Sequence, residues 1–399
     1  MSEVRRATVA ELQAEGILLV EDGNHGESRP RPDEFVDSGV AFVRAADMDA
    51  GRVLFETASR INDRARQRIT KGIGAPGDIL LSHKGTVGKV AIVQGDAPPF
   101  VCSPQTTFWR TLRTDVLDRH YLYAYLRSAQ FHRQLASRAG ETDMAPYVSL
   151  TAQRQLVVVL PPIAEQRRIA AILGALDEKI ELNRRIAASI EVLTRTIFEA
   201  RFVEPATRHE VDWPEVGLDS LGEFLNGLAL QKYPADGSGF LPVIKIAQLH
   251  SGDVSGADQA SLDVPARYVV NDGDLLFSWS GSLECVLWSG GNGALNQHLF
   301  KVTPRGVPQW FLYFWIHRHL DAFRGIAAGK ATTMGHIQRH HLSEARVPMP
   351  PHESLKEADR LVAPMFDAIV HRLVENRTII SLRDLMLPRL LSPQAEVPV

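Results

Sequence analysis

The most constraining feature of this sequence is an internal repeat with a period of roughly 190 residues, because a repeat determines architecture more firmly than local propensity does. Residues 77–85 read Gly-Asp-Ile-Leu-Leu-Ser-His-Lys-Gly, and residues 273–281 read Gly-Asp-Leu-Leu-Phe-Ser-Trp-Ser-Gly. Further matches keep the same order: Gln105 matches Gln297, and the Tyr-Leu-Tyr at 121–123 matches the Phe-Leu-Tyr at 311–313. We therefore expect two similar domains in one chain.

Each half ends in a double proline followed by a long helical pattern. Apolar residues recur at the 3-4 spacing of a coiled-coil seam. The seam residues that we expect to pair the helices and to support partner docking are Ile169, Leu173, Leu176, Ile180, Asn183 and Ile190 in the first pattern, and Ile369, Leu373, Asn376 and Ile380 in the second. A seam asparagine costs stability but fixes register. We expect Pro364 to kink the second helix and Pro388 to end it near Leu387.

The predicted fold is α/β of the mixed α+β kind. Two globular domains are expected in a pseudo-two-fold arrangement, separated by two long antiparallel coiled-coil helices. The expected ranges are 1–160 for the first globular domain, 161–203 for the first long helix, 204–349 for the second domain and 350–391 for the second long helix. Strands are expected near 40–43, 79–81, 90–93 and 157–160. Further helices are expected over 119–139 and 309–324.

Composition narrows the function classes only slightly. The net charge of −3 gives no global attraction to nucleic acid, so a DNA surface has to be local. The most basic window is 52–71, which is also compatible with a solvated helix face. Two cysteines without CxxC spacing argue against a disulfide framework or a zinc site. No apolar N-terminal run or membrane-length segment is present, and we expect a cytoplasmic protein.

Catalytic motifs are missing from the sequence. Residues 85–90, Gly-Thr-Val-Gly-Lys-Val, lack the spacer and the Ser/Thr of a phosphate loop. No zinc-protease or nucleophile-elbow pattern occurs. The Asp-Glu-Lys at 177–179 is better explained by charges beside the seam than by a nuclease centre. His336, His340 and His341 have no acidic residue spaced to complete a metal site, so no metal is expected.

The segment 160–173, Leu-Pro-Pro-Ile-Ala-Glu-Gln-Arg-Arg-Ile-Ala-Ala-Ile-Leu, followed by Asp177, Ile180 and Asn183, resembles the central conserved region of the specificity subunit of type I restriction-modification systems. The resemblance covers nearly the whole chain. The second copy departs from the pattern at 351–356, where the glutamine is missing.

The resemblance implies a non-catalytic subunit with two target-recognition domains, each of which reads one half of a split double-stranded DNA site, with the helices as a ruler between them. It implies two methyltransferase subunits that bind S-adenosylmethionine and methylate adenine N6, docked on the helices. It also implies ATP-dependent restriction subunits. S-adenosylmethionine, ATP and Mg²⁺ are expected on those partners and none in this chain.

Loop residues at matching places are the candidate DNA contacts, because guanine is read by Arg or Lys and adenine by Asn or Gln. They are Asn24, His25, Arg44, Lys84, Thr86, Gln105 and Tyr147 in the first half, and Lys245, Trp279, Ser280, Gln297, His298, Lys330, Thr332 and His336 in the second. Two other interpretations stay open. One is a scaffold whose coiled coil assembles proteins without DNA, and the other is a DNA-processing enzyme with an unrecognised site. A positive groove in each domain would favour DNA.

Overall fold

The computed structural model describes residues 4–139, 146–237, 239–329 and 335–391. It divides into two compact units: unit 1 comprises Met1–Asp177 with Leu382–Val399, and unit 2 comprises Glu178–Ser381. The ranges expected from the sequence kept the long helices apart from the globular domains, whereas each compact unit contains part of both helices. In the described part of the chain, no helix combines the length and apolar character of a membrane span.

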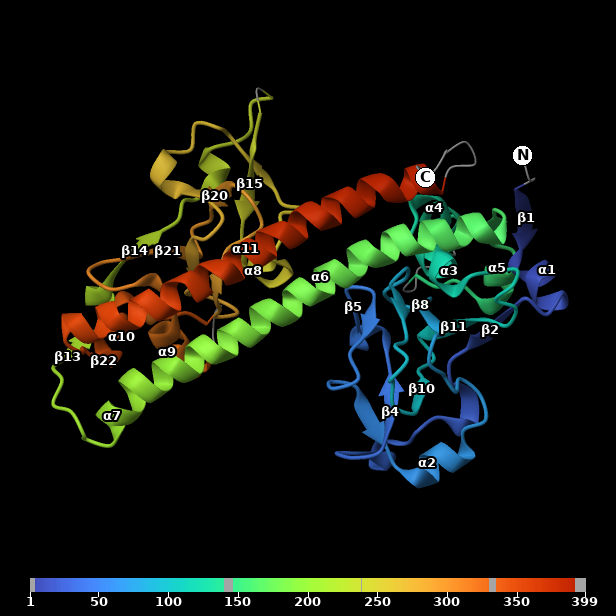
Figure 1. Cartoon of the computed structure of the whole chain (residues 1–399), viewed down its shortest axis with the longest axis horizontal. Coiled ribbons are helices and arrows are strands. Elements are labelled where there is room, and N and C mark those ends of the chain that lie inside the picture. The colour runs from blue at the N-terminus through green and yellow to red at the C-terminus, as the bar shows by residue number, and fades with distance from the viewer. Residues whose placement is uncertain (1–3, 140–145, 238, 330–334, 392–399) are drawn as a thin grey trace. The chain divides into compact units, whose positions relative to one another are not determined.

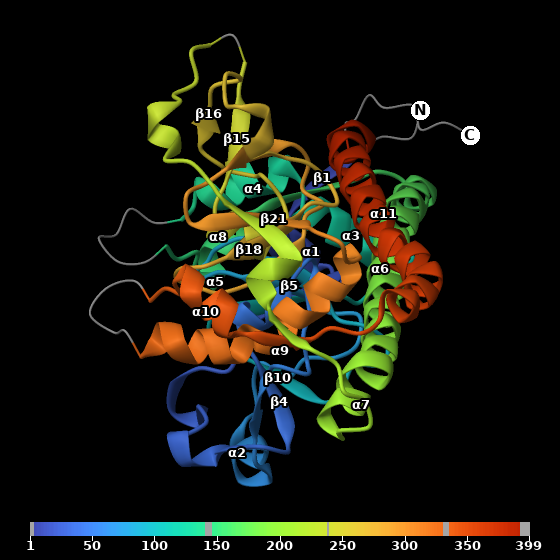
Figure 2. The ribbon, with the colours of Figure 1, turned by 90° about the vertical axis from the view of Figure 1, so that its left-hand side faces the viewer.

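The strands of unit 1 form sheets of order β1-β12, β10-β4-β7-β3 and β2-β11-β8-β9-β6-β5. Their bounds are β1 (Arg5–Thr8), β2 (Leu18–Asp22), β3 (Phe35–Val36), β4 (Val40–Val43), β5 (Met48–Asp49), β6 (Arg52–Val53), β7 (Ser59–Ile61), β8 (Ile79–Ser82), β9 (Val90–Ile92), β10 (Phe100–Cys102), β11 (Thr106–Thr111) and β12 (Val157–Leu160). In two views, β4, β10 and α2 lie remote from the start of α6 (Figures 1 and 2).

The helices of unit 1 are short apart from its share of the long pair. They are α1 (Val9–Ala14), α2 (Asp63–Arg68), α3 (Arg119–Leu126), α4 (Ala129–Ala136) and α5 (Leu150–Arg154). The single helix expected over 119–139 is wrong. Ser128 breaks it, because its hydroxyl accepts a hydrogen bond from the Phe131 amide at 3.2 Å and so caps a new helix.

Unit 2 repeats much of this topology. Its strands are β13 (Glu215–Gly217), β14 (Gly222–Asn226), β15 (Leu241–Ile244), β16 (Gln259–Ala260), β17 (Val269–Val270), β18 (Leu275–Ser278), β19 (Cys285–Leu287), β20 (Gly293–Leu295), β21 (Leu299–Pro304) and β22 (Arg346–Pro348), and its helices include α7 (Glu204–Thr207), α8 (Ile246–Ser251), α9 (Gln309–Ala328) and α10 (Arg339–Glu344). The order β14-β21-β18-β19 matches β2-β11-β8-β9, and β15 pairs in parallel with β20 as β4 does with β10. The units differ in that β7 pairs with β4, whereas β17 pairs with β20.

The repeated Gly-Asp has a structural role in both units. Gly77 and Gly273 adopt φ of 87° and 89°, which favours glycine. The Asp78 carboxylate accepts from the Ala75 amide at 2.7 Å and is bound by Arg110 of β11 at 2.7 and 2.8 Å. In unit 2, Asp274 accepts from the Asn271 amide at 2.7 Å and pairs with Lys301 of β21 at 2.7 Å. The motif therefore fastens the turn before β8 to β11 in unit 1, and the turn before β18 to β21 in unit 2.

The two long helices, α6 (Ile163–Phe198) and α11 (His352–Leu390), pack antiparallel. In unit 1, Ile169 and Leu173 share a core with Leu390, whereas in unit 2 the later Ala187 shares a core with the earlier Ile369. A π-helical segment (Glu199–Val203) continues α6. The expected stop before Pro388 is wrong. The helix continues to Leu390 although Pro388 donates no backbone hydrogen bond, and the buried Leu390 and Leu391 pack in the unit 1 core.

The expected seam residues are all buried or half-buried. Ile169, Leu173, Ile180, Asn183, Ile369 and Asn376 are buried, and Leu176, Ile190, Leu373 and Ile380 are half-buried. Asn183 Nδ2 donates to Asn376 Oδ1 at 3.0 Å and to Glu375 Oε2 at 2.8 Å. Asn376 Nδ2 donates in turn to the Ile180 carbonyl at 3.0 Å. The two matching asparagines of the repeat thus bind each other inside the helix pair.

Candidate nucleic-acid interface

The sequence-predicted contact residues gather at equivalent strand ends in the two units. In unit 1 the turn after β8 forms an isolated β-bridge between Lys84 and Tyr147. In unit 2 the turn after β18 forms the same bridge between Ser280 and His336. The amides of Gly85 and Gly281 donate to the carbonyls of Pro146 and Gly335 at 2.9 and 2.8 Å. The fold therefore builds one small polar site twice.

In unit 1 this site combines a cation with an aromatic ring. Lys84 is exposed, and its Nζ lies 5.9 Å from the centroid of the Tyr147 ring, which is 41% exposed. Thr86 is exposed in the same turn. A lysine and a tyrosine on adjacent backbone segments offer a charge for phosphate and a flat face for a sugar or base.

In unit 2 the equivalent site is more aromatic and less charged. The Trp279 ring lies 5.9 Å from that of His298 and 6.2 Å from that of His336. Ser280 is buried, and its hydroxyl bonds His298 Nδ1 at 3.0 Å. Ser280 therefore positions His298, and a direct contact of its own with DNA would require the turn to open.

The expected match of Gln105 with Gln297 is displaced by one residue. The ladders place Thr106 opposite Ser82 and Leu299 opposite Ser278, so that Gln105 is equivalent to His298. The backbone agrees, because the amides of His83 and Trp279 donate to the carbonyls of Gln105 and His298 at 2.9 and 3.3 Å. The alignment by residue identity was wrong because the turn preceding β21 does not align residue for residue with that preceding β11.

Two basic side chains also occupy equivalent places. Arg44 follows β4 and Lys245 follows β15, and the backbone amide of each donates to a side chain three residues further on, to Asp47 at 2.8 Å and to Gln248 at 3.2 Å. Arg44 donates to Ser59 Oγ at 2.9 Å, and Lys245 forms an ion pair with Asp258. Both side chains are about half exposed, at 46%. Each of these cations lies beside a carboxylate, since Arg44 Nε is 3.6 Å from Asp47 Oδ2 and Lys245 pairs with Asp258.

One hollow in unit 2 has a volume of about 670 Å³. Lys245, Gln297 and His298 line it together with Asp258 and Asn296. Three of the predicted contacts therefore face one cavity that offers hydrogen-bond donors and acceptors, which is the chemistry that reads base edges.

The remaining predicted contacts lie in different surroundings. His25 is about half exposed, with its Nε2 3.8 Å from Asp22 Oδ2. Asn24 is only 1% exposed, so a direct contact with DNA would require its loop to move. Lys330 and Thr332 lie outside the described residues. The role of each predicted contact stays a prediction.

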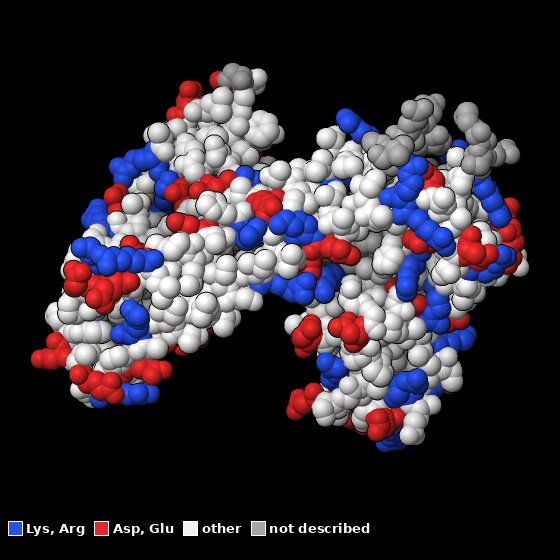
Figure 3. Space-filling view, viewed as in Figure 1, with Lys and Arg blue, Asp and Glu red and all other residues white. Residues whose placement is uncertain are grey.

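Charges on the surface are mixed in sign. On the face shown in Figure 3, Lys and Arg alternate with Asp and Glu over both units. That face carries no single basic field.

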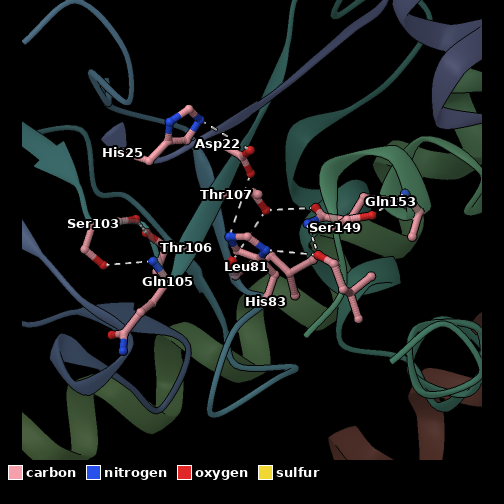
Figure 4. Close-up of polar contacts among 12 residues, drawn as sticks. Asp22, His25, Leu81, His83, Ser103, Gln105, Thr106, Thr107, Ser149 and Gln153 are labelled. Carbon is pink, nitrogen blue, oxygen red and sulfur yellow. Dashed lines mark hydrogen bonds and ion pairs between the residues drawn. The ribbon is translucent and has the colours of Figure 1, made fainter. Parts of the chain in front are cut away.

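One buried titratable group in unit 1 escaped the sequence analysis. His83 follows β8 and is 2% exposed, and Figure 4 shows Asp22 between His83 and His25, while the Gln105 side chain points away from them. Burial lowers the pKa of His83, and the nearby Asp22 carboxylate opposes that shift. Extending the repeat to residues 21–24 and 225–228, both of which carry a glycine after Asp or Asn, would have revealed Asp22 and its counterpart Asn226.

The statement that no acidic residue accompanies the histidines is wrong. Possible ligand atoms of His340, His341 and Glu344 lie within 4.8 Å of one another, because Glu344 lies one helical turn further along α10. His336 is not part of that group. At 177–179, the Asp177 carboxylate is bound by Arg127 and Arg383 at 2.8 Å each, which supports the interpretation as structural charges.

Comparison with known proteins gives the family. The family model described as the type I restriction modification DNA specificity domain matches residues 35–192 and 210–373. The chain therefore belongs to this family of specificity subunits, whose role is DNA sequence specificity.

Individual relatives are distant. The MjaVIII specificity subunit of Methanocaldococcus jannaschii is 24% identical over 169 residues, which span 41% of this chain and 39% of that relative. The HindI specificity subunit of Haemophilus influenzae is 21% identical over 445 residues, which span 88% of this chain and 94% of the relative. The crystal structure of the type I restriction-modification S subunit from M. genitalium aligns with a TM-score of 0.57 at 13% identity, covering 98% and 97% of the two chains, and thus shares the fold.

Proposed function

We propose that units 1 and 2 carry two target-recognition domains that read the two halves of a split DNA site. We also propose that the chain directs adenine methylation and restriction by partner subunits and catalyses neither reaction. The observation that carries this proposal is the duplicated strand-end site, with Lys84 and Tyr147 bridged in unit 1 and Ser280 and His336 in unit 2. Two similar sites in one chain suit a target in two parts.

Base choice would fall to side chains with directional hydrogen bonds. Gln105, Gln297 and His298 can pair with base edges, whereas Arg44, Lys84 and Lys245 suit guanine or phosphate. The two surfaces would also include His25, Thr86, Trp279 and His336. The buried Asn24 and Ser280 would hold the contact residues in place without touching DNA.

Partner docking would fall to the outward faces of the long helices, because the predicted seam residues pack inward. On α6, Leu182, Val192 and Leu193 are 45%, 66% and 49% exposed, and Leu361 of α11 is 42% exposed. Exposed apolar side chains on a helix are typical of protein interfaces. Two methyltransferase subunits with S-adenosylmethionine would dock there, and restriction subunits with ATP and Mg²⁺ would join them. This chain would bind none of these cofactors.

Charge reversal at the two sites tests the proposal. Lys84→Glu combined with Lys245→Glu is expected to abolish specific DNA binding, measured by fluorescence anisotropy, while leaving methyltransferase association intact in size-exclusion chromatography. Arg113→Glu is the matched control, because it reverses an exposed charge beyond the opposite end of β11.

Unchanged DNA affinity in the double variant would remove both lysines from the interface. Stable partner association without any specific DNA binding by the wild-type chain would favour a protein scaffold.

A further inference from the structure

The buried His83 of unit 1 has an unusual hydrogen-bonding situation. Its Nδ1 lies 3.0 Å from the Val148 carbonyl oxygen, which also accepts from Gln153 Nε2 at 3.2 Å. Its Nε2 makes no hydrogen bond of good geometry among the described residues and lies 3.8 Å from Asp22 Oδ1, a buried oxygen that accepts no hydrogen bond there (Figure 4). The backbone of Pro104 also interacts with the His83 ring and, like Asp22, raises its pKa.

Hydrogen-bond chemistry limits the protonation states that satisfy this site. A carbonyl oxygen only accepts, so Nδ1 has to carry a hydrogen. In neutral His83 the bare Nε2 then faces a carboxylate, which is a second acceptor. The other neutral tautomer instead turns a bare Nδ1 toward the Val148 carbonyl. Only the doubly protonated ring supplies a donor to both oxygens.

Unit 2 contains the same pair with a permanent donor. The ladders place Thr107 opposite Asp22 and Phe300 opposite Asn226, so these two strand-end residues are equivalent, as are His83 and Trp279. Trp279 Nε1 donates to Asn226 Oδ1 at 2.8 Å. An indole nitrogen always carries its hydrogen. In unit 2 the hydrogen bond between Trp279 and Asn226 therefore forms at any pH. In unit 1 the equivalent bond between His83 and Asp22 forms only when His83 Nε2 carries a proton.

The backbone of His83 ties the pair to the candidate interface. The His83 amide donates to the Gln105 carbonyl at 2.9 Å, and the His83 carbonyl accepts from the Val148 amide at 2.9 Å. Lys84 follows directly, and the ring of Tyr147 lies 5.5 Å from that of His83. A shift of His83 would move Lys84, Gln105 and Tyr147 together.

We propose that His83 and Asp22 are positioning residues for the unit 1 interface, and that DNA binding there is coupled to uptake of one proton by His83, which closes the hydrogen bond to Asp22. This inference rests on the proposed function, because it assigns a role within the same site. Unit 2 requires no such proton.

The sign of the pH dependence follows from the groups that face His83. These are Asp22 of β2, His25 in the turn after it, the adjacent Lys84, and Tyr147 across the bridge. Burial and Lys84 lower the pKa of His83, so the free protein favours the neutral ring. DNA phosphates add negative charge and raise the pKa in the complex. Affinity is therefore highest below the free-state pKa and falls by up to about tenfold per pH unit until the bound-state pKa is passed.

Asp22→Asn is the decisive variant. Its amide Nδ2 can donate to the bare Nε2 of neutral His83, so it closes the pair without a proton. The control is Asn226→Asp in unit 2, where Trp279 still donates to the carboxylate. Calorimetry with the full chain in buffers of different ionisation enthalpy counts the protons taken up. The probe is a duplex carrying the motif found by methylation mapping, compared with an equally long duplex without it.

We expect the wild type and Asn226→Asp to take up as much as one proton more than Asp22→Asn within the range of about pH 5–8 in which histidines titrate. In ¹⁵N-histidine NMR, the His83 signal is assigned as the one that the His83→Gln variant lacks. In the wild-type complex its Nε2 shift should be that of an imidazolium. Equal proton uptake in all three proteins, or a neutral His83 in the motif complex, overturns the inference while leaving DNA recognition intact. Failure of the wild type to prefer the motif duplex refutes the proposed function and the inference with it.

Discussion

Replacing the paired seam asparagines should produce strongly non-additive stability changes. Asn376 makes two buried hydrogen bonds, from Asn183 Nδ2 and to the Ile180 carbonyl, at 3.0 Å each. Asn376→Leu removes both and leaves the buried Asn183 amide with only its bond to Glu375. A lost bond costs about 1 kcal/mol and an orphaned buried polar group about 1–3 kcal/mol, so we expect a loss of about 2–3 kcal/mol.

The double variant Asn183→Leu with Asn376→Leu should recover most of that loss. Both polar groups disappear together and leave an apolar seam, so its stability should lie within about 1 kcal/mol of the wild type. Each single variant, by contrast, leaves a partner unsatisfied. The double variant also removes the register signal, so the helices are expected to lose unique alignment.

Urea unfolding followed by circular dichroism measures these differences as midpoint shifts at constant m. The expected coupling between the two substitutions is about 2 kcal/mol or more, whereas independent sites add within about 0.5 kcal/mol. Additive losses in the double variant would refute the view that the asparagines act as a pair.

Three further predictions concern other contacts. Arg110→Ala should cost about 2–3 kcal/mol, because Asp78 is left buried with only a backbone donor, and a shift under 0.5 kcal/mol in urea unfolding would contradict this. Arg377 holds the pKa of Asp272 below its usual range, so this pair stabilises above about pH 4 and its contribution disappears as pH falls through the lowered pKa. Arg377→Gln should therefore show a smaller acid-induced drop in melting temperature than the wild type, and equal drops would refute the assignment. Inserting four residues after both Asn183 and Asn376 adds about 6 Å to each helix of the pair and should lengthen the gap in the recognised site by about two base pairs, whereas an unchanged gap in the methylated motif would refute the ruler.

Features with a strong sequence period were predictable. The seam spacing located both long helices, and the repeat placed one asparagine in each apolar stripe. That these two asparagines bind each other was not predicted, because equivalent positions of two antiparallel helices meet only near the local two-fold axis. The Gly-Asp match marked the strand that follows it in each unit, β8 and β18, although only the structure shows that its carboxylate holds a turn.

Features that depend on a single local interaction were not predictable from periodicity. The break at Ser128 depends on a hydroxyl cap within a continuous apolar pattern, and the continuation past Pro388 depends on tertiary packing of Leu390. Pairing Gln105 with Gln297 relied on residue identity, whereas the ladder matches Gln105 with His298. The role of His83 required knowing that its Nε2 faces Asp22, which no sequence spacing reveals.

The central claim is that this chain selects the DNA sequence on which partner subunits act. A long-read methylation map of DNA from cells expressing this chain with a cognate methyltransferase, compared with cells expressing the methyltransferase alone, tests it most directly. We predict N6-methyladenine at a two-part motif with a fixed gap, only when this chain is present. Methylation that is the same without this chain, or a motif that ignores substitutions in both units, would contradict the claim.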